Sequence, residues 1–168
     1  MTTLKRGAIA ASLAAAASLA AATAARADLI TQKALTHSIA MTIAETAVEA
    51  CKAKGYAVSV HVVGRDGETI AALRGDGAAP HTWENSQRKA YTARTTRAPT
   101  AAFAERIAQN NPLALQQATL KGMIGIAGGL PIKAGDEVIG GGGVSGSPGG
   151  NDEPCLQAGL DKVKDQLR

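Results

Sequence analysis

The hydrophobic period of the chain changes at Gly55, and this change limits the fold more than any other feature. Between residues 30 and 54, apolar side chains recur at the spacing of a helix, at Ala34, Leu35, Ile39, Ile43, Ala47, Val48 and Cys51. In the following stretch, YAVSVHVV, valines alternate with Ser59 and His61, as in a strand with one buried face. The sequence therefore predicts a helix that ends at Gly55 and leads directly into a strand.

Turn residues and further periodic segments give the order of the remaining elements. Arg65-Asp66-Gly67 supplies a turn between the first strand and a second, ETIAALR. Residues 79–97, APHTWENSQRKAYTARTTR, are predicted to form a helix, followed by the shorter helices AAFAERIAQ and PLALQQAT. MIGIAGGLPI and DEVIGGGGVSG are predicted to form a second hairpin, and a last helix is predicted over roughly residues 153–167. This order favours an α+β fold, an antiparallel sheet flanked by helices, over a parallel Rossmann-type sheet.

The first 27 residues have the order of a secretory signal peptide. Lys5 and Arg6 precede an uncharged run rich in Ala and Leu, and Ala25-Arg26-Ala27 fits the small-x-small cleavage pattern. The run is shorter and less apolar than the roughly 20 strongly apolar residues of a spanning helix, which argues against an uncleaved anchor. We expect residues 1–27 to be removed and residues 28–168 to form a single domain, periplasmic or secreted.

The charge of the chain gives no support to a nucleic-acid partner. The whole chain has 18 basic and 14 acidic residues, a net charge of +4. Loss of the leader removes three basic residues and leaves 15 against 14, a net charge of +1. A protein that binds nucleic acid is expected to keep a clustered basic face with interleaved aromatic side chains.

Motifs of nucleotide binding and of common catalytic sites are weak or missing. Residues 141–146 satisfy the letters of GxGxxG, but no helix begins at the third glycine, and the next helix opens with acidic residues that would repel a phosphate. We interpret Asn151 or Asp152 as the cap of the last helix, and the glycines as room for a bulky neighbour, including another subunit or a flat ligand. The chain has no GxSxG, no HExxH and no His pair at metal-ligand spacing. The sequence thus identifies no catalytic residue and favours a role without turnover.

The two cysteines, Cys51 and Cys155, fall on the first and last predicted helices. In an oxidising compartment they can form a disulfide if those helices lie side by side on the sheet. Two small buried residues that never meet are the alternative. Their spacing argues against a CxxC redox site or a structural zinc site.

Three segments resemble a known family. They are TWENSQRKAYTAR, IAGGLPIKAGDEVIGGGGVSGSPGGNDEPCLQAGL and VSVHVVGRDGETIAALRGDGA, which are similar to the GlcG/HbpS family of small haem-binding proteins and to the C-terminal domain of PduO-type proteins. The resemblance implies a profilin/roadblock-like sandwich of order α-β-β-α-α-β-β-α, homo-oligomers up to octamers, and haem as the ligand. The chain departs from the family at Gly64, where the family usually has Asp, so a role that needs that carboxylate is not implied.

The helix predicted over residues 79–97 carries the side chains that a haem site needs. Haem requires an axial ligand, usually His, an apolar slot for the macrocycle, and cations for its propionates. The residues that we predict to contact haem are His81, Trp83, Arg88 and Lys89. His81 is the first choice as iron ligand, because Thr82 as the N-cap would leave it outside the helix. His37 is the second choice as iron ligand and His61 the third. The alternative for Trp83 is ordinary packing, and for Arg88 and Lys89 it is a solvated helix face.

Two functions stay open from the sequence. The first is an exported haem-binding protein that captures, stores or senses haem without clear catalytic machinery. The second is an enzyme or accessory factor that acts on a small metabolite or corrinoid. In either case the small side chains of Ser86, Ala90 and Ala93 predict a helix face that is buried against copies of the same protein.

Overall fold

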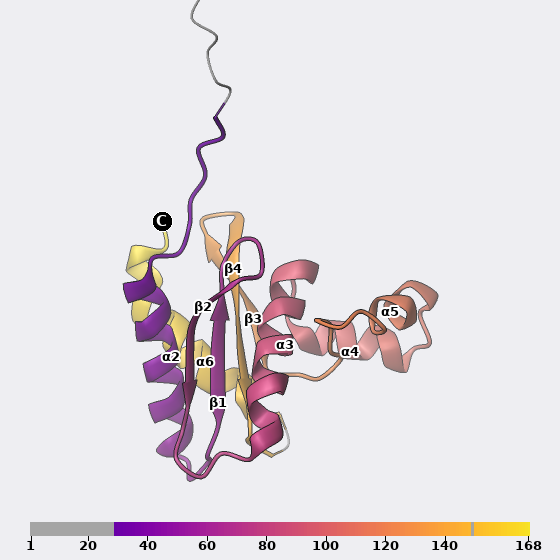
Figure 1. Ribbon diagram of the computed structural model, residues 1–168, viewed down its shortest axis with the longest axis horizontal. Coiled ribbons are helices and arrows are strands. Elements are labelled where there is room, and N and C mark those ends of the chain that lie inside the picture. The colour runs from indigo at the N-terminus through magenta and orange to yellow at the C-terminus, as the bar shows by residue number, and fades with distance from the viewer. Residues whose placement is uncertain (1–28, 149) are drawn as a thin grey trace, which may run out of the picture. The chain divides into compact units, whose positions relative to one another are not determined.

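Four antiparallel strands form the centre of the fold (Figure 1). They are β1 (Ser59–Val63), β2 (Thr69–Arg74), β3 (Gly129–Ala134) and β4 (Glu137–Ser145), and their order in the sheet is β2-β1-β4-β3. Each neighbouring pair is antiparallel. The computed structural model describes residues 29–148 and 150–168, so the predicted signal peptide, residues 1–27, lies outside the described residues.

Helices cover both faces of this sheet (Figure 1). On one face lie α2 (His37–Lys52) and α6 (Asp152–Val163), which is followed by the short 3₁₀ helix η1 (Lys164–Gln166). On the other face lies α3 (Pro80–Thr96), and α4 (Thr100–Ala108) and α5 (Pro112–Gln117) extend from it away from the sheet. Residues 33–168 form one compact unit. The predicted α+β order with an antiparallel sheet between helices is confirmed.

The main core lies between the sheet and the α2–α6 face. Val60 and Val62 of β1 pack there with Ile43 of α2 and Leu156 of α6, and all four are fully buried. A second, smaller core of Phe103, Ala114 and Met123 holds α4 and α5 together. In the part of the chain that the structure describes, no helix is long and apolar enough to cross a membrane.

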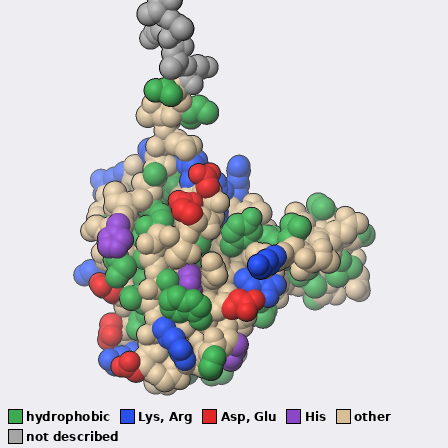
Figure 2. Space-filling model, in the orientation of Figure 1, with side chains coloured by type: hydrophobic (Ala, Val, Ile, Leu, Met, Phe, Trp, Pro, Cys, Tyr) green, Lys and Arg blue, Asp and Glu red, His purple; other side chains and the backbone are tan. Residues whose placement is uncertain are grey.

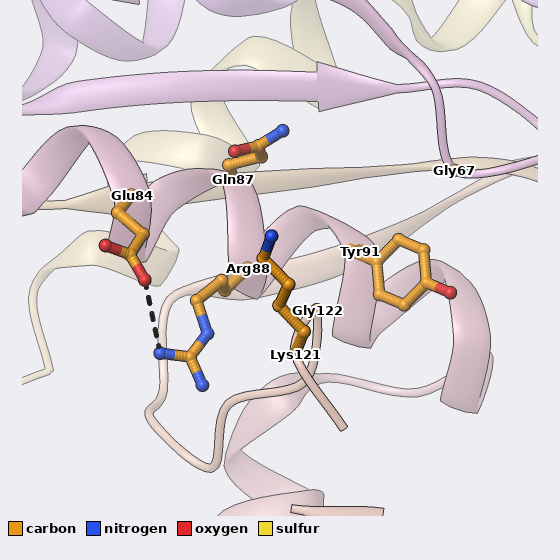
Figure 3. A pocket seen from close by; sticks show the side chains of 7 residues that line it. All are labelled: Gly67, Glu84, Gln87, Arg88, Tyr91, Lys121 and Gly122. Atoms are coloured by element: carbon orange, nitrogen blue, oxygen red, sulfur yellow. Dashed lines mark ion pairs between the residues drawn. The ribbon is translucent and has the colours of Figure 1, made fainter. Parts of the chain in front are cut away.

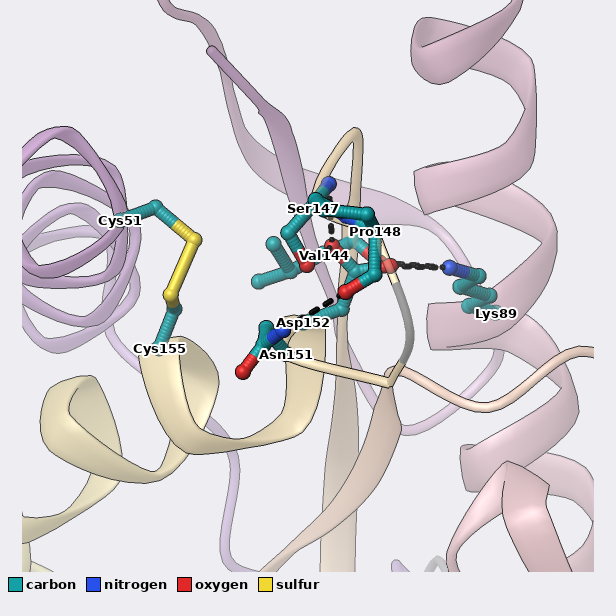
Figure 4. The surroundings of a disulfide bond; sticks show 8 residues. All are labelled: Cys51, Lys89, Val144, Ser147, Pro148, Asn151, Asp152 and Cys155. Carbon is teal, nitrogen blue, oxygen red and sulfur yellow. Dashed lines mark hydrogen bonds and ion pairs between the residues drawn. A yellow bond between two sulfur atoms is a disulfide. The ribbon is translucent and has the colours of Figure 1, made fainter. Parts of the chain in front are cut away.

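A disulfide joins the two helices of the main core face. Cys51 of α2 and Cys155 of α6 are bridged, with their Cα atoms 5.4 Å apart (Figure 4). The predicted condition, that the first and last helices lie side by side, is met. Both cysteines are fully buried, so the bridge is part of the core.

Two predicted element boundaries are wrong. The first helix begins at His37 instead of near Ile30, because Thr36 ends the preceding segment and its Oγ1 accepts a hydrogen bond from the backbone of Ile39 at 3.3 Å. Residues 29–36 have no regular secondary structure. The third strand begins at Gly129 instead of Met123, since Met123 belongs to the small core against α4 and α5.

The glycines of β4 make room for α3. A methyl group on Gly143 would lie 2.5 Å from the backbone nitrogen of Ala90 and would also meet the carbonyl of Ser86. A methyl group on Gly141 would meet the carbonyl of Ala90 in the same way. The bulky neighbour that the sequence predicted is therefore the backbone of α3, in place of another subunit or a flat ligand.

Candidate functional site

Buried polar side chains join α3 to β1. Ser59 Oγ lies 2.8 Å from Thr82 Oγ1, and His61 Nδ1 lies 2.8 Å from Ser86 Oγ. All four side chains are buried. Ser59 and His61 lie on the face of β1 opposite to its core valines, because side chains alternate along a strand. These contacts fix which side of α3 faces the sheet and which side is left outward.

The hydrogen bonds of Ser86 determine which nitrogen of His61 carries the proton. Ser86 Oγ donates its hydrogen to the carbonyl of Trp83, 2.9 Å away. A hydroxyl group has one hydrogen, so Ser86 accepts from His61 Nδ1–H, and Nε2 keeps its lone pair. Burial lowers the pKa of His61 from 6.5 to about 4, so the ring is neutral at pH 7. The Trp83 ring packs edge-on against it, with ring centroids 4.4 Å apart.

His81 lies at the exposed start of α3. The prediction that Thr82 is the N-cap is wrong, because α3 begins at Pro80 with Ala79 as its N-cap. Thr82 Oγ1 instead donates to the carbonyl of Ala79 within the first turn, at 2.7 Å. His81 is thus a helical residue, and its imidazole remains accessible to a ligand. Two positions further on, Trp83 is 42% exposed.

Lys89 is used inside the protein. Only 2% of its side chain is exposed, and its Nζ lies 2.7 Å from Asp152 Oδ2 and 2.9 Å from the carbonyl oxygen of Val144 (Figure 4). The other carboxylate oxygen of Asp152 accepts hydrogen bonds from the backbone nitrogen and hydroxyl of Ser147, at 2.9 and 2.7 Å. The prediction that Lys89 contacts haem is therefore wrong, because its charge is already matched and enclosed. Its position shows that it ties α3 to the start of α6.

Arg88 lines a cavity of about 380 Å³ on the outer side of α3 (Figure 3). The lining residues come from α3, from the β1–β2 turn and from the segment before β3; they are Gly67, Glu84, Gln87, Arg88, Tyr91, Lys121 and Gly122. Arg88 Nη2 donates to the carbonyl of Met123 at 2.7 Å, which holds the guanidinium in place. The three- and four-residue spacing of Glu84, Arg88 and Tyr91 was a usable sequence signal for this group. Nothing in the sequence relates Lys121 to it.

The structure does not bring His37 and His81 together. His37 is the first residue of α2 and His81 lies on α3, and these helices cover opposite faces of the sheet. Histidine side chains are also apart from one another on the face shown in Figure 2. Within residues 29–148 and 150–168, no group of three His, Cys, Asp or Glu side chains is arranged to hold a metal ion.

The helix face predicted to meet another subunit is buried within the protein. Ser86, Ala90 and Ala93 are fully buried, and the first two contact the glycines of β4. That part of the prediction is wrong, because the glycines let α3 lie directly on its own sheet. On the face shown in Figure 2, Lys and Arg side chains are interspersed with acidic and apolar ones.

The chain matches a known family and several solved structures. The sequence model for "Haem degrading protein HbpS-like" matches residues 35–161. HbpS of Streptomyces reticuli, solved as a double mutant, is 40% identical with a TM-score of 0.77, over 83% of this chain and 94% of that chain. Protein ORFY of Klebsiella pneumoniae is 27% identical with a TM-score of 0.75, over 82% of this chain and 96% of that chain.

More distant structures share the fold. A PduOC–haem complex is 22% identical with a TM-score of 0.71, over 77% of this chain and 94% of that chain. A comparison with curated protein sequences gave no match. Since the family match covers most of the chain, including the whole sheet and α3, the chain belongs to the HbpS-like family.

Proposed function

We propose that this is an exported haem-binding protein that captures, stores or senses haem, with the outward side of α3 as its haem face. The observation that carries the proposal is that this helix, in a chain of the HbpS-like family, presents an exposed imidazole two turns before a guanidinium that lines a cavity. These are the two polar groups that haem requires, one for iron and one for a propionate.

The spacing on α3 suits a ligand of this kind. His81 and Arg88 are seven residues apart, which is two helical turns, so both lie on one side of the helix. At a rise of about 1.5 Å per residue, they are separated by about 10 Å along the helix axis. The ring of Tyr91, which lines the cavity with Arg88, adds apolar surface to this side. When bound, haem would supply an iron centre able to bind or activate small molecules.

A second function is suggested by the name of the family, haem degradation. We favour binding without turnover, because the sequence identified no catalytic residue.

Hemin titration tests the proposal. Saturable binding with a Soret band is expected, and absence of saturable binding would leave the small-metabolite or corrinoid function in its place.

Adding ascorbate in air to the complex separates binding from degradation. A stable Soret band supports binding alone, whereas its loss together with iron release supports the degrading function.

Export is part of the same proposal. The Cys51–Cys155 disulfide suits an oxidising compartment, in agreement with the leader expected from the sequence. Intact mass of protein from its native host should correspond to a chain that starts at Asp28. A mass that retains residues 1–27 would contradict export by cleavage.

We also propose self-association, through a different surface from the one first predicted. Large apolar side chains are exposed on and after α5, at Leu113, Leu115, Leu120 and Ile126. Exposed apolar side chains of this kind are a more suitable contact for a second copy than the buried face of α3. Light scattering at micromolar concentration should report an oligomer, and a strict monomer would refute this part.

A further inference from the structure

The cavity beside Arg88 has an excess of positive charge. Arg88 and Lys121 line it, with Glu84 as the single carboxylate among its lining residues. Glu84 lies 3.5 Å from Arg88 Nη1, and its side chain is 73% exposed, so solvent weakens this pair. Lys121 is exposed and forms no ion pair with any residue that the structure describes. A ligand with a negative charge would therefore meet one unneutralised cation and one weakly paired cation.

Arg88 is oriented in advance for such a ligand. The bond from Nη2 to the carbonyl of Met123 fixes the plane of the guanidinium. Arg88 Nε is buried and has no hydrogen-bond partner among the described residues. Buried donors in proteins are nearly always bonded, so this nitrogen is a donor still without an acceptor. The planar fork of a guanidinium matches a carboxylate better than it matches a point charge.

An aromatic wall completes the cavity. Tyr91 lies between two glycines, and a methyl group would lie 2.6 Å from its ring at Gly67 and 2.8 Å from it at Gly122. Any larger residue at either position would displace the ring. The cavity volume of about 380 Å³ falls at the small end of the range for ligand sites. It thus suits a carboxylate attached to a flat apolar group.

We propose that this cavity is a carboxylate-binding site in which Arg88 and Lys121 hold the anion and Tyr91 packs against the group that carries it. The carboxylate comes either from a haem propionate, in which case the inference rests on the proposed function, or from a small free aromatic acid. In the first case Lys121 takes the role that the sequence assigned to Lys89.

Binding of benzoate tests the free acid as a source, with neutral benzamide as the matched probe. Calorimetry should show that benzoate binds and benzamide does not, and the Arg88 Nε–H resonance should shift on benzoate addition. Arg88→Met and Lys121→Met should each weaken benzoate binding by about tenfold or more, as expected for loss of a charge-assisted hydrogen bond. Lys162→Met, an exposed lysine on α6 across the sheet, should leave it unchanged.

Hemin and its dimethyl ester test the propionate as a source, because the ester has no free carboxylate. Wild-type protein should bind hemin about tenfold or more tighter than the ester, and Arg88→Met should remove most of this difference. Lys121→Met should have the same effect, and since Lys121 is exposed, its replacement leaves the fold intact.

The outcomes separate the two sources and the two proposals. If only benzoate binds more tightly than its neutral analogue, the ligand is a free acid. If only hemin binds more tightly than its ester, the ligand is a haem propionate. If hemin fails to bind at all, the proposed haem-binding function is refuted, and the benzoate titration still tests whether this cavity binds a carboxylate. If neither arm depends on Arg88 and Lys121, the cavity is not a carboxylate site.

Discussion

Lys89 carries a positive charge that is almost fully enclosed by the protein. Replacement by Met would leave Asp152 buried without its ammonium partner. Breaking such a pair from one side costs about 3 to 5 kcal/mol of unfolding free energy. Urea denaturation of Lys89→Met should show this loss. Lys52→Met removes an exposed pair with Glu49, whose atoms are 3.8 Å apart, and should change stability by less than about 1 kcal/mol. Equal effects of the two replacements would contradict the structural role of Lys89.

His61 makes stability depend on pH. Its pKa is lowered from 6.5 to about 4 by burial, so between these values the unfolded chain binds a proton that the folded protein does not. Stability is therefore lost as the pH falls from about 6.5 to about 4, by about 3 kcal/mol in total. Unfolding free energies at pH 7 and pH 4.5 should differ less in His61→Gln than in wild type. His37→Gln, at an exposed position, should keep the wild-type difference, and a His61→Gln variant that also keeps it would refute this assignment.

At the scale of elements, the contact between α3 and β4 depends on the absence of side chains at the β4 glycines. Gly143→Ala places a methyl group against backbone atoms of α3, which cannot move aside as a side chain can. We expect a loss of about 1 to 3 kcal/mol, as for other overpacked sites. Gly64→Ala is the matched control, because its methyl group would meet only side-chain ends, those of Glu68 and Ile70, which can move aside. Thermal unfolding in which both variants match wild type would show that α3 can lie further from the sheet.

The disulfide connects α2 to α6 across 104 residues of chain. By restricting the unfolded chain, a loop of this length contributes up to about 4 to 5 kcal/mol. A double variant, Cys51→Ala with Cys155→Ala, should lose a large part of this in urea denaturation. Alkylation of denatured, unreduced wild-type protein provides the chemical check, since two freely reacting thiols would rule the bridge out.

On the scale of the whole molecule, local patterns in the sequence predicted the sheet and the order of its helices. The period change at Gly55 and the turn at Gly67 were sufficient for the end of α2 and for β1 and β2, but not for the start of α2. The role of Lys89 was not predictable in this way, because its partner Asp152 lies 63 residues further along the chain. Lys121 likewise reaches the Arg88 cavity only when the segment before β3 folds back on α3. Local periodicity shows which side chains share a face, whereas the partner of each one depends on the fold.

The central claim, that the outward side of α3 binds haem through His81, is tested most directly by comparing two single replacements in a hemin titration. His81→Ala should weaken hemin binding and shift the Soret band, because loss of an axial nitrogen changes the ligand field of iron. His37→Ala, also at an exposed position but on the opposite face of the sheet, should bind hemin with wild-type affinity and spectrum. Wild-type binding and spectrum in His81→Ala would contradict the claim, and the same effects in His37→Ala alone would move the iron site to α2.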